Sequence, residues 1–505
     1  MHCVDGNDYS IFSILPPYNN LHAQLIKDGN LVNSGISLTY EATADSNGSW
    51  NTTSVGKTNF WDYADTLYGS VLEQDVGLTG KRVPSTIPEA LDYNQNNRWF
   101  EAEGIPIMPV DDTGSNNPYP MVKVVARDPN GDELAAARVV LPVSSEMSCI
   151  SCHASTTSSD PALNGAKPLS GWISDPDPEK DWKKNILALH DEMEQNNALF
   201  TAALSSSGYG EGGLLASALG GAPVLCARCH SSNALPGTGI DGISPLTQAI
   251  HNGHSRVSDP QTGVSLNESQ NRDSCYLCHP GSTTQCLRGA MGSATNGGET
   301  TMDCQSCHGS IRQVGDSQRE GWLDQPNCQS CHHDGLREVR AIDSSGKLLQ
   351  WGDSRFATNS DTPSSGYSLY RYSRGHGDLQ CEACHGATHA IYPSSHANDN
   401  ILAQDLQGYS GTIATCSVCH DTVPLTATGG PHGMHTTGES WVKGHEDYAE
   451  RDSSGCTACH GSDYRGGVLS QVKTARSFST EWGLKTFSAG QSIGCYDCHN
   501  GPSGD

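Results

Sequence analysis

Alternating hydrophobic and polar positions mark the first part of the chain as β-rich. Residues 36–40 (Ile-Ser-Leu-Thr-Tyr) alternate as a half-buried strand does. Residues 121–126 and 137–141 are two further runs rich in valine, and the segment 128–131 between them (Asp-Pro-Asn-Gly) is a strong turn signal. The sequence therefore predicts a β-hairpin over these two runs.

Five aromatic residues gather in the same part of the chain: Trp50, Phe60, Trp61, Tyr63 and Tyr68. We expect them to form the core of a β-rich domain, with an exposed binding surface as the alternative. The loop 45–48 (Asp-Ser-Asn-Gly) has residues that calcium loops use. Because it lacks the remaining oxygen ligands, a plain turn is favoured.

The clearest helical pattern covers residues 181–204. Trp182, Ile186, Leu189 and Met193 recur at helical spacing and predict one amphipathic helix. His190 follows Ile186 by four residues, so it borders the same buried face.

Beyond residue 145 the sequence Cys-x-x-Cys-His occurs nine times. Two cysteines at this spacing can form thioethers with the two vinyl groups of one haem, and the next histidine then binds the iron, so the motif is typical of c-type haem attachment. The motifs predict nine haem c groups held by Cys149, Cys152 and His153; Cys226, Cys229 and His230; Cys275, Cys278 and His279; Cys304, Cys307 and His308; Cys328, Cys331 and His332; Cys381, Cys384 and His385; Cys416, Cys419 and His420; Cys456, Cys459 and His460; and Cys495, Cys498 and His499.

The motifs have two other possible interpretations, zinc binding and haems with a purely structural role. Structural zinc sites take four ligands, usually from two separated pairs, without a histidine fixed after every second cysteine. Zinc therefore fits the array poorly. Single haems could serve mainly to hold the fold together, although the array as a whole does not suit that role.

The density of motifs predicts the fold class. About forty residues are available for each motif in residues 146–505, too few for an ordinary side-chain core. We expect a nonahaem c-type cytochrome domain over residues 146–505, with little regular secondary structure: loops and short helices around stacked haems. A β-rich haem-free domain over residues 1–145 precedes it.

The net charge and the haem motifs indicate which partners are disfavoured and where in the cell the protein acts. The formal net charge of −26 disfavours nucleic acid and anionic lipid as partners, because both require a positive surface. Haem c is attached outside the cytoplasm, so we expect an exported protein whose signal peptide has been removed before Met1. No apolar run approaches the roughly twenty residues of a membrane helix. The expected location is extracellular or at the cell surface, with the periplasm as the alternative.

Twelve histidines lie outside the motifs, and nine haems require nine second ligands to be fully bis-histidine. Two imidazoles leave no open iron position, which favours electron transfer over substrate binding. We exclude His2 at the terminus, His396 in a Pro-Ser-Ser loop, and His333 beside His332. The remaining nine are predicted axial ligands: His22, His190, His251, His254, His376, His389, His432, His435 and His445.

Spacing restricts which haem each histidine can serve. His389 follows His385 by four residues, so in a helical turn it would serve a different haem. His251 and His254 are three apart, as are His432 and His435, and each pair could point at two adjacent haems. Ligands shared in this way would bring haems close together and give a continuous electron path.

Two cysteines, Cys3 and Cys286, lie outside the motifs. In an oxidising compartment a remaining even pair usually joins, so a disulfide between them is predicted, with two buried free thiols as the alternative.

Four stretches carry a family resemblance: residues 15–24 (LPPYNNLHAQ), 286–289 (CLRG), 381–390 (CEACHGATHA) and 459–466 (CHGSDYRG). They resemble large extracellular multihaem c-type cytochromes of metal-reducing and related bacteria. The resemblance implies export, bis-histidine haems and respiratory electron transfer toward the cell exterior. Some cytochromes of this class form electron-conducting filaments.

These observations favour an electron-transfer protein rather than an enzyme. Expected partners are other redox proteins or extracellular electron acceptors, together with further copies of the chain in a homo-polymer. Variants are a filament subunit, a cell-surface terminal reductase of metal oxides and a periplasmic shuttle. The alternatives are a multihaem oxidoreductase that reduces a small nitrogen or sulfur oxyanion and an adhesive surface protein. Related nitrite reductases often carry Cys-x-x-Cys-Lys, which does not occur in this sequence.

Overall fold

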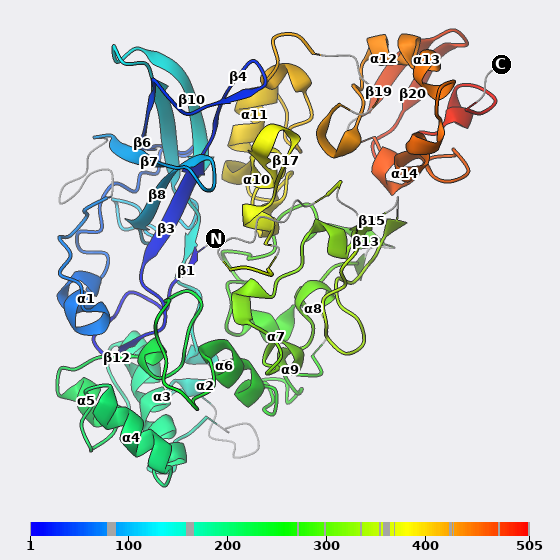
Figure 1. Cartoon of the computed structure of the whole chain (residues 1–505). Helices are drawn as coiled ribbons and strands as arrows, with labels where there is room; N and C mark the ends of the chain where they lie inside the picture. The colour runs from blue at the N-terminus through cyan, green and yellow to red at the C-terminus, as the bar shows by residue number, and fades with distance from the viewer. Residues whose placement is uncertain are drawn as a thin grey trace.

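A six-stranded antiparallel sheet from the N-terminal part of the chain forms one side of the molecule (Figure 1). The computed structural model describes residues 2–77, 87–157, 166–269, 272–296, 299–333, 336–352, 355–356, 364–367, 369–423, 427, 429–472 and 475–502. The strand order is β10-β9-β6-β7-β8-β3. The strands are β3 (Tyr18–Ala23), β6 (Ser37–Thr43), β7 (Glu89–Asn94), β8 (Trp99–Pro106), β9 (Met121–Arg127) and β10 (Glu133–Val140).

The predicted hairpin and the predicted single strand are both confirmed. β9 and β10 pair antiparallel, and the turn closes where Gly131 N donates to Asp128 O at 3.0 Å. Gly131 has φ 92°, a conformation that favours glycine. In β6 the residues Leu38, Tyr40 and Ala42 are buried and alternate with more exposed neighbours, as the sequence pattern predicted.

Four of the five aromatics predicted to form the core of the β-rich domain pack together around one helix, in a cluster separate from the core of the sheet, and the prediction is wrong for Trp50. Phe60 is buried on α1 (Phe60–Tyr68), where Trp61, Tyr63 and Tyr68 pack against the same cluster. Trp50 is 38% exposed, because the polar residues that follow it occupy the interior instead. Thr52, for example, donates through Oγ1 to the Asp112 carboxylate at 2.6 Å.

The loop 45–48 is a plain turn in the structure. The Asp45 carboxylate accepts hydrogen bonds from the backbone N of Asn47 at 2.8 Å and of Ser49 at 3.0 Å. It therefore holds its own backbone, as Asp commonly does at a turn.

The single helix predicted over residues 181–204 is instead two helices, α3 (Pro178–Glu194) and α4 (Ala198–Ser206). The Asn197 side chain accepts from Leu199 N and caps α4, so a local polar contact ends the continuous pattern. Trp182 is buried as predicted, whereas Met193 is 73% exposed.

Beyond residue 225 the described elements are short, and none exceeds the nine residues of α6 (Leu246–His254). The other helices of the region that begins with the first motif are α2 (Ile150–His153), α5 (Leu214–Leu219), α7 (Asp273–Tyr276), α8 (Cys304–His308), α9 (Ile311–Val314), α10 (Cys381–His385), α11 (Ile401–Gln407), α12 (Glu439–Gly444), α13 (Glu446–Ala449) and α14 (Thr457–His460). Short antiparallel pairs join β13 (Thr295–Asn296) to β14 (Glu299–Thr300), β15 (His332–His333) to β16 (Leu336–Arg337), β17 (Arg374–Gly375) to β18 (Leu379–Gln380), and β19 (Arg476–Thr480) to β20 (Gly483–Phe487). In the described ranges, no helix has both the length and the apolarity that a membrane span requires.

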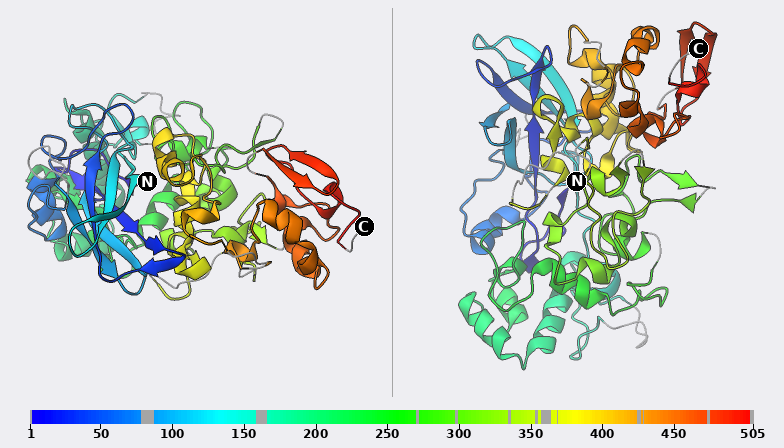
Figure 2. Two further views of the ribbon diagram at one scale, coloured as in Figure 1. Left: turned by 90° about the horizontal axis from the view of Figure 1, so that it is seen from above. Right: turned by 45° about the vertical axis from the view of Figure 1, so that its right-hand side comes forward.

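Two short strands at the start of the chain pair with distant segments, and the second of them connects the sheet region to the motif region. β1 (His2–Cys3) pairs with β11 (Val143–Ser144), and β2 (Phe12–Ser13) pairs with β12 (Val224–Leu225). A third small ribbon, β4 (Leu25–Lys27) with β5 (Asn30–Val32), extends from the sheet. Figure 2 shows the motif region running along the sheet and ending in a lobe of α12–α14, β19 and β20 at the C-terminus.

Candidate haem sites

The motifs fold as single helical turns that place both thiols and the imidazole together. In five motifs the same hydrogen bond recurs: the backbone N of the histidine donates to the carbonyl of the first cysteine, as in His153 to Cys149 at 2.9 Å and His279 to Cys275 at 2.8 Å. Gly309, Gly386 and Gly461 directly follow three motifs and have φ between 79° and 84°. The recurring Cys-His-Gly sequence thus reflects a shared left-handed turn after the motif.

Eight motif histidines face a second histidine across a nearly constant gap. The ring centroids are 5.8–6.4 Å apart in the pairs His153–His254, His230–His190, His279–His251, His308–His389, His385–His432, His420–His376, His460–His435 and His499–His445. The structure therefore brings eight of the nine predicted second ligands to motif histidines.

This gap fits a metal atom between the rings. A bond of about 2 Å between a metal and an imidazole nitrogen puts the ring centroid roughly 3 Å from the metal, so two rings on opposite faces are about 6 Å apart. The residues around these histidines also line one cavity of about 2870 Å³, to which every motif except Cys416–His420 contributes. The donor set and the apolar space both fit haem c.

Most second histidines are oriented by a hydrogen bond at the nitrogen that does not face the gap. Nδ1 lies 2.7 Å from the Thr247 carbonyl in His251, 2.7 Å from the Ile250 carbonyl in His254, and 3.0 Å from the Val442 carbonyl in His445. A carbonyl accepts from Nδ1–H, which fixes the tautomer that leaves Nε2 free to bind a metal.

Burial keeps four of the facing imidazoles neutral. It lowers the pKa of His153, His279 and His389 to about 4 and that of His308 to about 3. A metal binds the neutral form of imidazole, so these rings are in the required state at neutral pH.

The remaining predicted ligand and the three excluded histidines have other neighbours. His22 on β3 stacks on Trp99, with ring centroids 4.0 Å apart. His333 stacks on Trp351 at 3.7 Å and His396 on Tyr119 at 3.5 Å, while His2 Nε2 lies 2.9 Å from the Pro16 carbonyl. The ring of His332 lies 6.0 Å from that of Phe356.

We number the sites 1 to 9 in motif order, from Cys149–His153 to Cys495–His499, and several contacts place them side by side. α6 carries His254, which faces site 1, and His251, which faces site 3. The Cys275 and Cys304 thiols lie close enough to influence each other's pKa, which places sites 3 and 4 side by side. Cys149 and Cys226 pack against one core cluster, which joins sites 1 and 2.

Further contacts show which of the later sites are neighbours. Burial and the nearby Cys331 raise the pKa of Cys307 to about 12, which marks sites 4 and 5 as neighbours. Burial and Cys381 raise the pKa of Cys328 to about 12, which does the same for sites 5 and 6. Ile413 N donates to Cys384 O at 2.9 Å, linking site 6 to the segment before site 7.

Sites 8 and 9 continue from site 6 through closely spaced histidines. His432 faces site 6 and His435, three residues later, faces site 8. His460 Nδ1 lies 2.6 Å from the carbonyl of Ile493, two residues before the motif of site 9.

Sequence reasoning did not foresee that three particular side chains lie beside these sites. Trp441 stacks on His435 with ring centroids 4.1 Å apart and lies 6.1 Å from His445, so it stands between the second histidines of sites 8 and 9. Phe356 lies between His332 and His432. The spacing of Trp441 four residues before His445 could have revealed it, whereas nothing in the sequence singles out Phe356.

The third of these side chains is Cys286, for which a disulfide with Cys3 was predicted. Both thiols are free in the structure, so that prediction is wrong for this state. Cys286 Sγ lies instead 3.1 Å from Nδ1 of His389, in the position that a backbone carbonyl takes at other second histidines.

Short helices around paired histidines, with thiols in Cys-x-x-Cys-His turns, define a multihaem c-type cytochrome. Residues 300–473 match the family model described as outer membrane cytochrome MtrC/MtrF-like, domains II/IV. The match covers about a third of the chain and confirms the resemblance to extracellular multihaem cytochromes. It includes the stretches 381–390 and 459–466, two of the four that suggested this class. No curated protein and no solved structure matches the chain.

Proposed function

We propose that this chain conducts electrons through nine haem c groups at the cell surface or outside the cell. The observation that carries the proposal is the set of eight histidine pairs with centroids 5.8–6.4 Å apart. The nine motifs supply the count, and the family match supports the extracellular class. Haem c supplies a reversible one-electron couple when bound. We retain residues 1–145 as a haem-free unit and 146–505 as the haem-binding unit.

Contacts between neighbouring sites support one route for the electrons. We infer the order 2–1–3–4–5–6, with site 7 on one branch from site 6 and sites 8 and 9 on the other. Paired second ligands, His251 with His254 and His432 with His435, fix neighbouring sites at short separation. Trp441 fills the space between the ligands of sites 8 and 9 and excludes water there.

Electron transfer is favoured over reduction of an oxyanion because such an enzyme needs an open iron position. Histidines lie on both sides of eight sites, which leaves no open position at those irons. Reduction of metal oxides at the surface is compatible with the same route, since it needs only outward transfer.

A head-to-tail filament is a second proposal. In Figure 1 the segment of site 2, between β12 and α6, and the C-terminal lobe with site 9 lie at opposite ends of the molecule. A contact between such unlike ends generates an open assembly when its rotation does not close. The charge of −26 per chain opposes it, so the junction would have to be apolar or metal-bridged.

Mass spectrometry and electron paramagnetic resonance test the main proposal. The intact mass of the purified protein should exceed the 53.7 kDa polypeptide by nine haems. The oxidised protein should show low-spin ferric signals. A strong high-spin signal together with cyanide or nitrite binding would favour the oxyanion reductase instead. Electron micrographs separate rods of variable length from uniform particles and so decide the filament.

A further inference from the structure

One cluster of metal-binding side chains lies on the sheet, apart from the haem motifs. His22 on β3 stands directly opposite Glu101 on β8 in the antiparallel register. Glu103 is two residues further along β8, so its side chain leaves the same face of the sheet. One ligand atom from each of the three residues can lie within 4.8 Å of both others.

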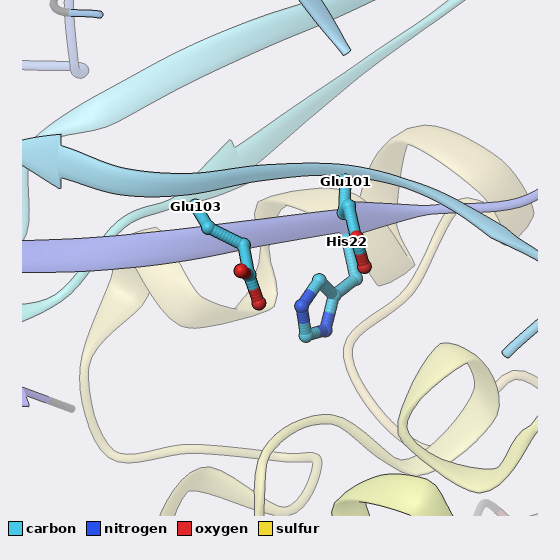
Figure 3. Close-up of side chains that lie close together, drawn as sticks. All are labelled: His22, Glu101 and Glu103. Carbon is cyan, nitrogen blue, oxygen red and sulfur yellow. The ribbon is translucent and has the colours of Figure 1, made fainter. Parts of the chain in front are cut away.

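The three side chains converge. In Figure 3 the imidazole of His22 lies between the carboxylates of Glu101 and Glu103. Trp99, on the same face of β8, stacks on the imidazole with an interplanar angle of 10° and holds the ring in place. The Glu101 carboxylate is oriented in turn, because it accepts from Asn94 Nδ2 at 3.0 Å and from Trp99 Nε1.

Two features of the cluster call for a cation. His22 Nε2 is buried and makes no hydrogen bond within the described part of the chain. A buried polar atom without a partner is costly, and a metal ion would satisfy it. The carboxylates of Glu101 and Glu103 leave the same face of β8 close together, so they repel one another, and a positive charge between them would relieve this repulsion.

The chemistry of the donors selects the class of ion. Imidazole nitrogen together with two carboxylate oxygens suits divalent first-row transition metals, whereas magnesium and calcium prefer oxygen alone. The imidazole of His22 would bind the ion in its neutral form. Arg371 is the positive charge that acts on His22, and the two carboxylates outweigh it.

We propose that His22, Glu101 and Glu103 bind one divalent transition-metal cation. This role for His22 differs from the axial haem ligation expected from the sequence. The site is half-buried between the sheet and the motif region, since the Trp99 ring also lies 5.7 Å from that of Tyr372. Tyr372 precedes Ser373, whose carbonyl accepts from Cys381 N at 3.0 Å, so the cation lies beside the segment of site 6.

Binding of Zn²⁺ to the haem-loaded protein tests the site. After treatment with a chelator and dialysis, calorimetric titration should reveal one saturable Zn²⁺ site per chain. Glu103→Gln and His22→Ala should each weaken binding at least about tenfold, because even outer-shell partners of a metal contribute that much. Glu133→Gln, an exposed carboxylate on the far edge strand β10, is the matched control and should leave the affinity unchanged.

Two results would overturn the proposal. Weak binding of several Zn²⁺ ions, insensitive to Glu103→Gln, would mean that the acidic surface alone attracts the ion. Loss of a low-spin haem signal in His22→Ala would assign His22 to an iron, in the same chain or a neighbouring copy. The haem content and spectrum of each variant report folding separately, and neither result bears on electron transfer through the other eight sites.

Discussion

The sheet region, residues 1–145, and the motif region, residues 146–505, are held together in different ways. The sheet encloses a core of side chains such as Tyr40, Ile105 and Val143, each at most 2% exposed. Among the described residues, the buried hydrophobic clusters take no member beyond Ala227. The later motifs surround a cavity instead. The sheet and the part of the motif region up to Ala227 are therefore stable through their own side chains, whereas the later motifs need covalently attached haem to complete their interior.

The largest expected effect comes from preventing haem attachment. A chain exported without the haem-attachment machinery should leave the later motifs open to protease while the sheet region persists, because the described residues beyond Ala227 add no member to the buried hydrophobic clusters. Limited proteolysis with mass spectrometry should yield a resistant fragment that ends near Ala227. Equal rates of cleavage throughout the chain would remove the contrast between the regions.

Breaking the buried connection between the regions should have the next largest effect. Lys183 on α3 is fully buried, donates to the carbonyl of Asp8 at 2.5 Å and lies 3.6 Å from the Asp5 carboxylate. Lys183→Met leaves a buried carboxylate without its cation and should cost about 3–5 kcal/mol.

Denaturant unfolding measures this cost, and Lys180→Met is the control. Lys180 is 35% exposed and lies 3.8 Å from Asp8, so its loss should cost about 0–1 kcal/mol. Similar costs for both variants would mean that the buried contact contributes little.

A cavity introduced into the sheet core tests whether the sheet region unfolds separately from the motif region. Ile105→Ala removes a side chain that is 1% exposed and should destabilise the sheet by about 2–5 kcal/mol. The low-spin haem spectrum should persist at denaturant concentrations that already unfold the sheet. Leu134→Ala, at 54% exposure on β10, should change stability by less than about 0.5 kcal/mol.

The smallest effect is expected from removing the contact between the Cys286 thiol and His389. Cys286→Ala removes the sulfur beside His389 Nδ1, so the imidazole donates less electron density and the potential of the site 4 haem should rise. A hydrogen bond of about 1 kcal/mol corresponds to roughly 40 mV for one electron. Potentiometric titration followed by paramagnetic resonance measures the shift. Cys3→Ala should leave this potential unchanged, and a shift of equal size there would show that both thiols act together.

Local patterns in the sequence predicted the elements that local interactions determine. The hairpin of β9 and β10 and the turn of each motif follow from residues close in the chain. Spacing also indicated that His389 would serve another site than His385, and in the structure it faces His308.

Contacts between distant residues were harder to predict. Nothing near His254 indicates that it faces His153, because their distance depends on how the whole chain folds. The break before α4 was missed because Asn197 caps a helix inside an otherwise continuous apolar pattern. The disulfide prediction counted cysteines but could not foresee that His389 would lie beside Cys286.

The position of α6 in the chain has a consequence for biogenesis. A polypeptide that crosses the membrane N-terminus first presents Cys149 and Cys152 to the attachment machinery well before His254 has emerged. Haem joined at the first motif must therefore wait with one face unprotected until α6 arrives. The same helix carries His251, which is therefore already outside when the third motif, Cys275–His279, follows. Slowing synthesis between residues 153 and 246 would lengthen this exposed interval and favour oxidative loss of the first haem.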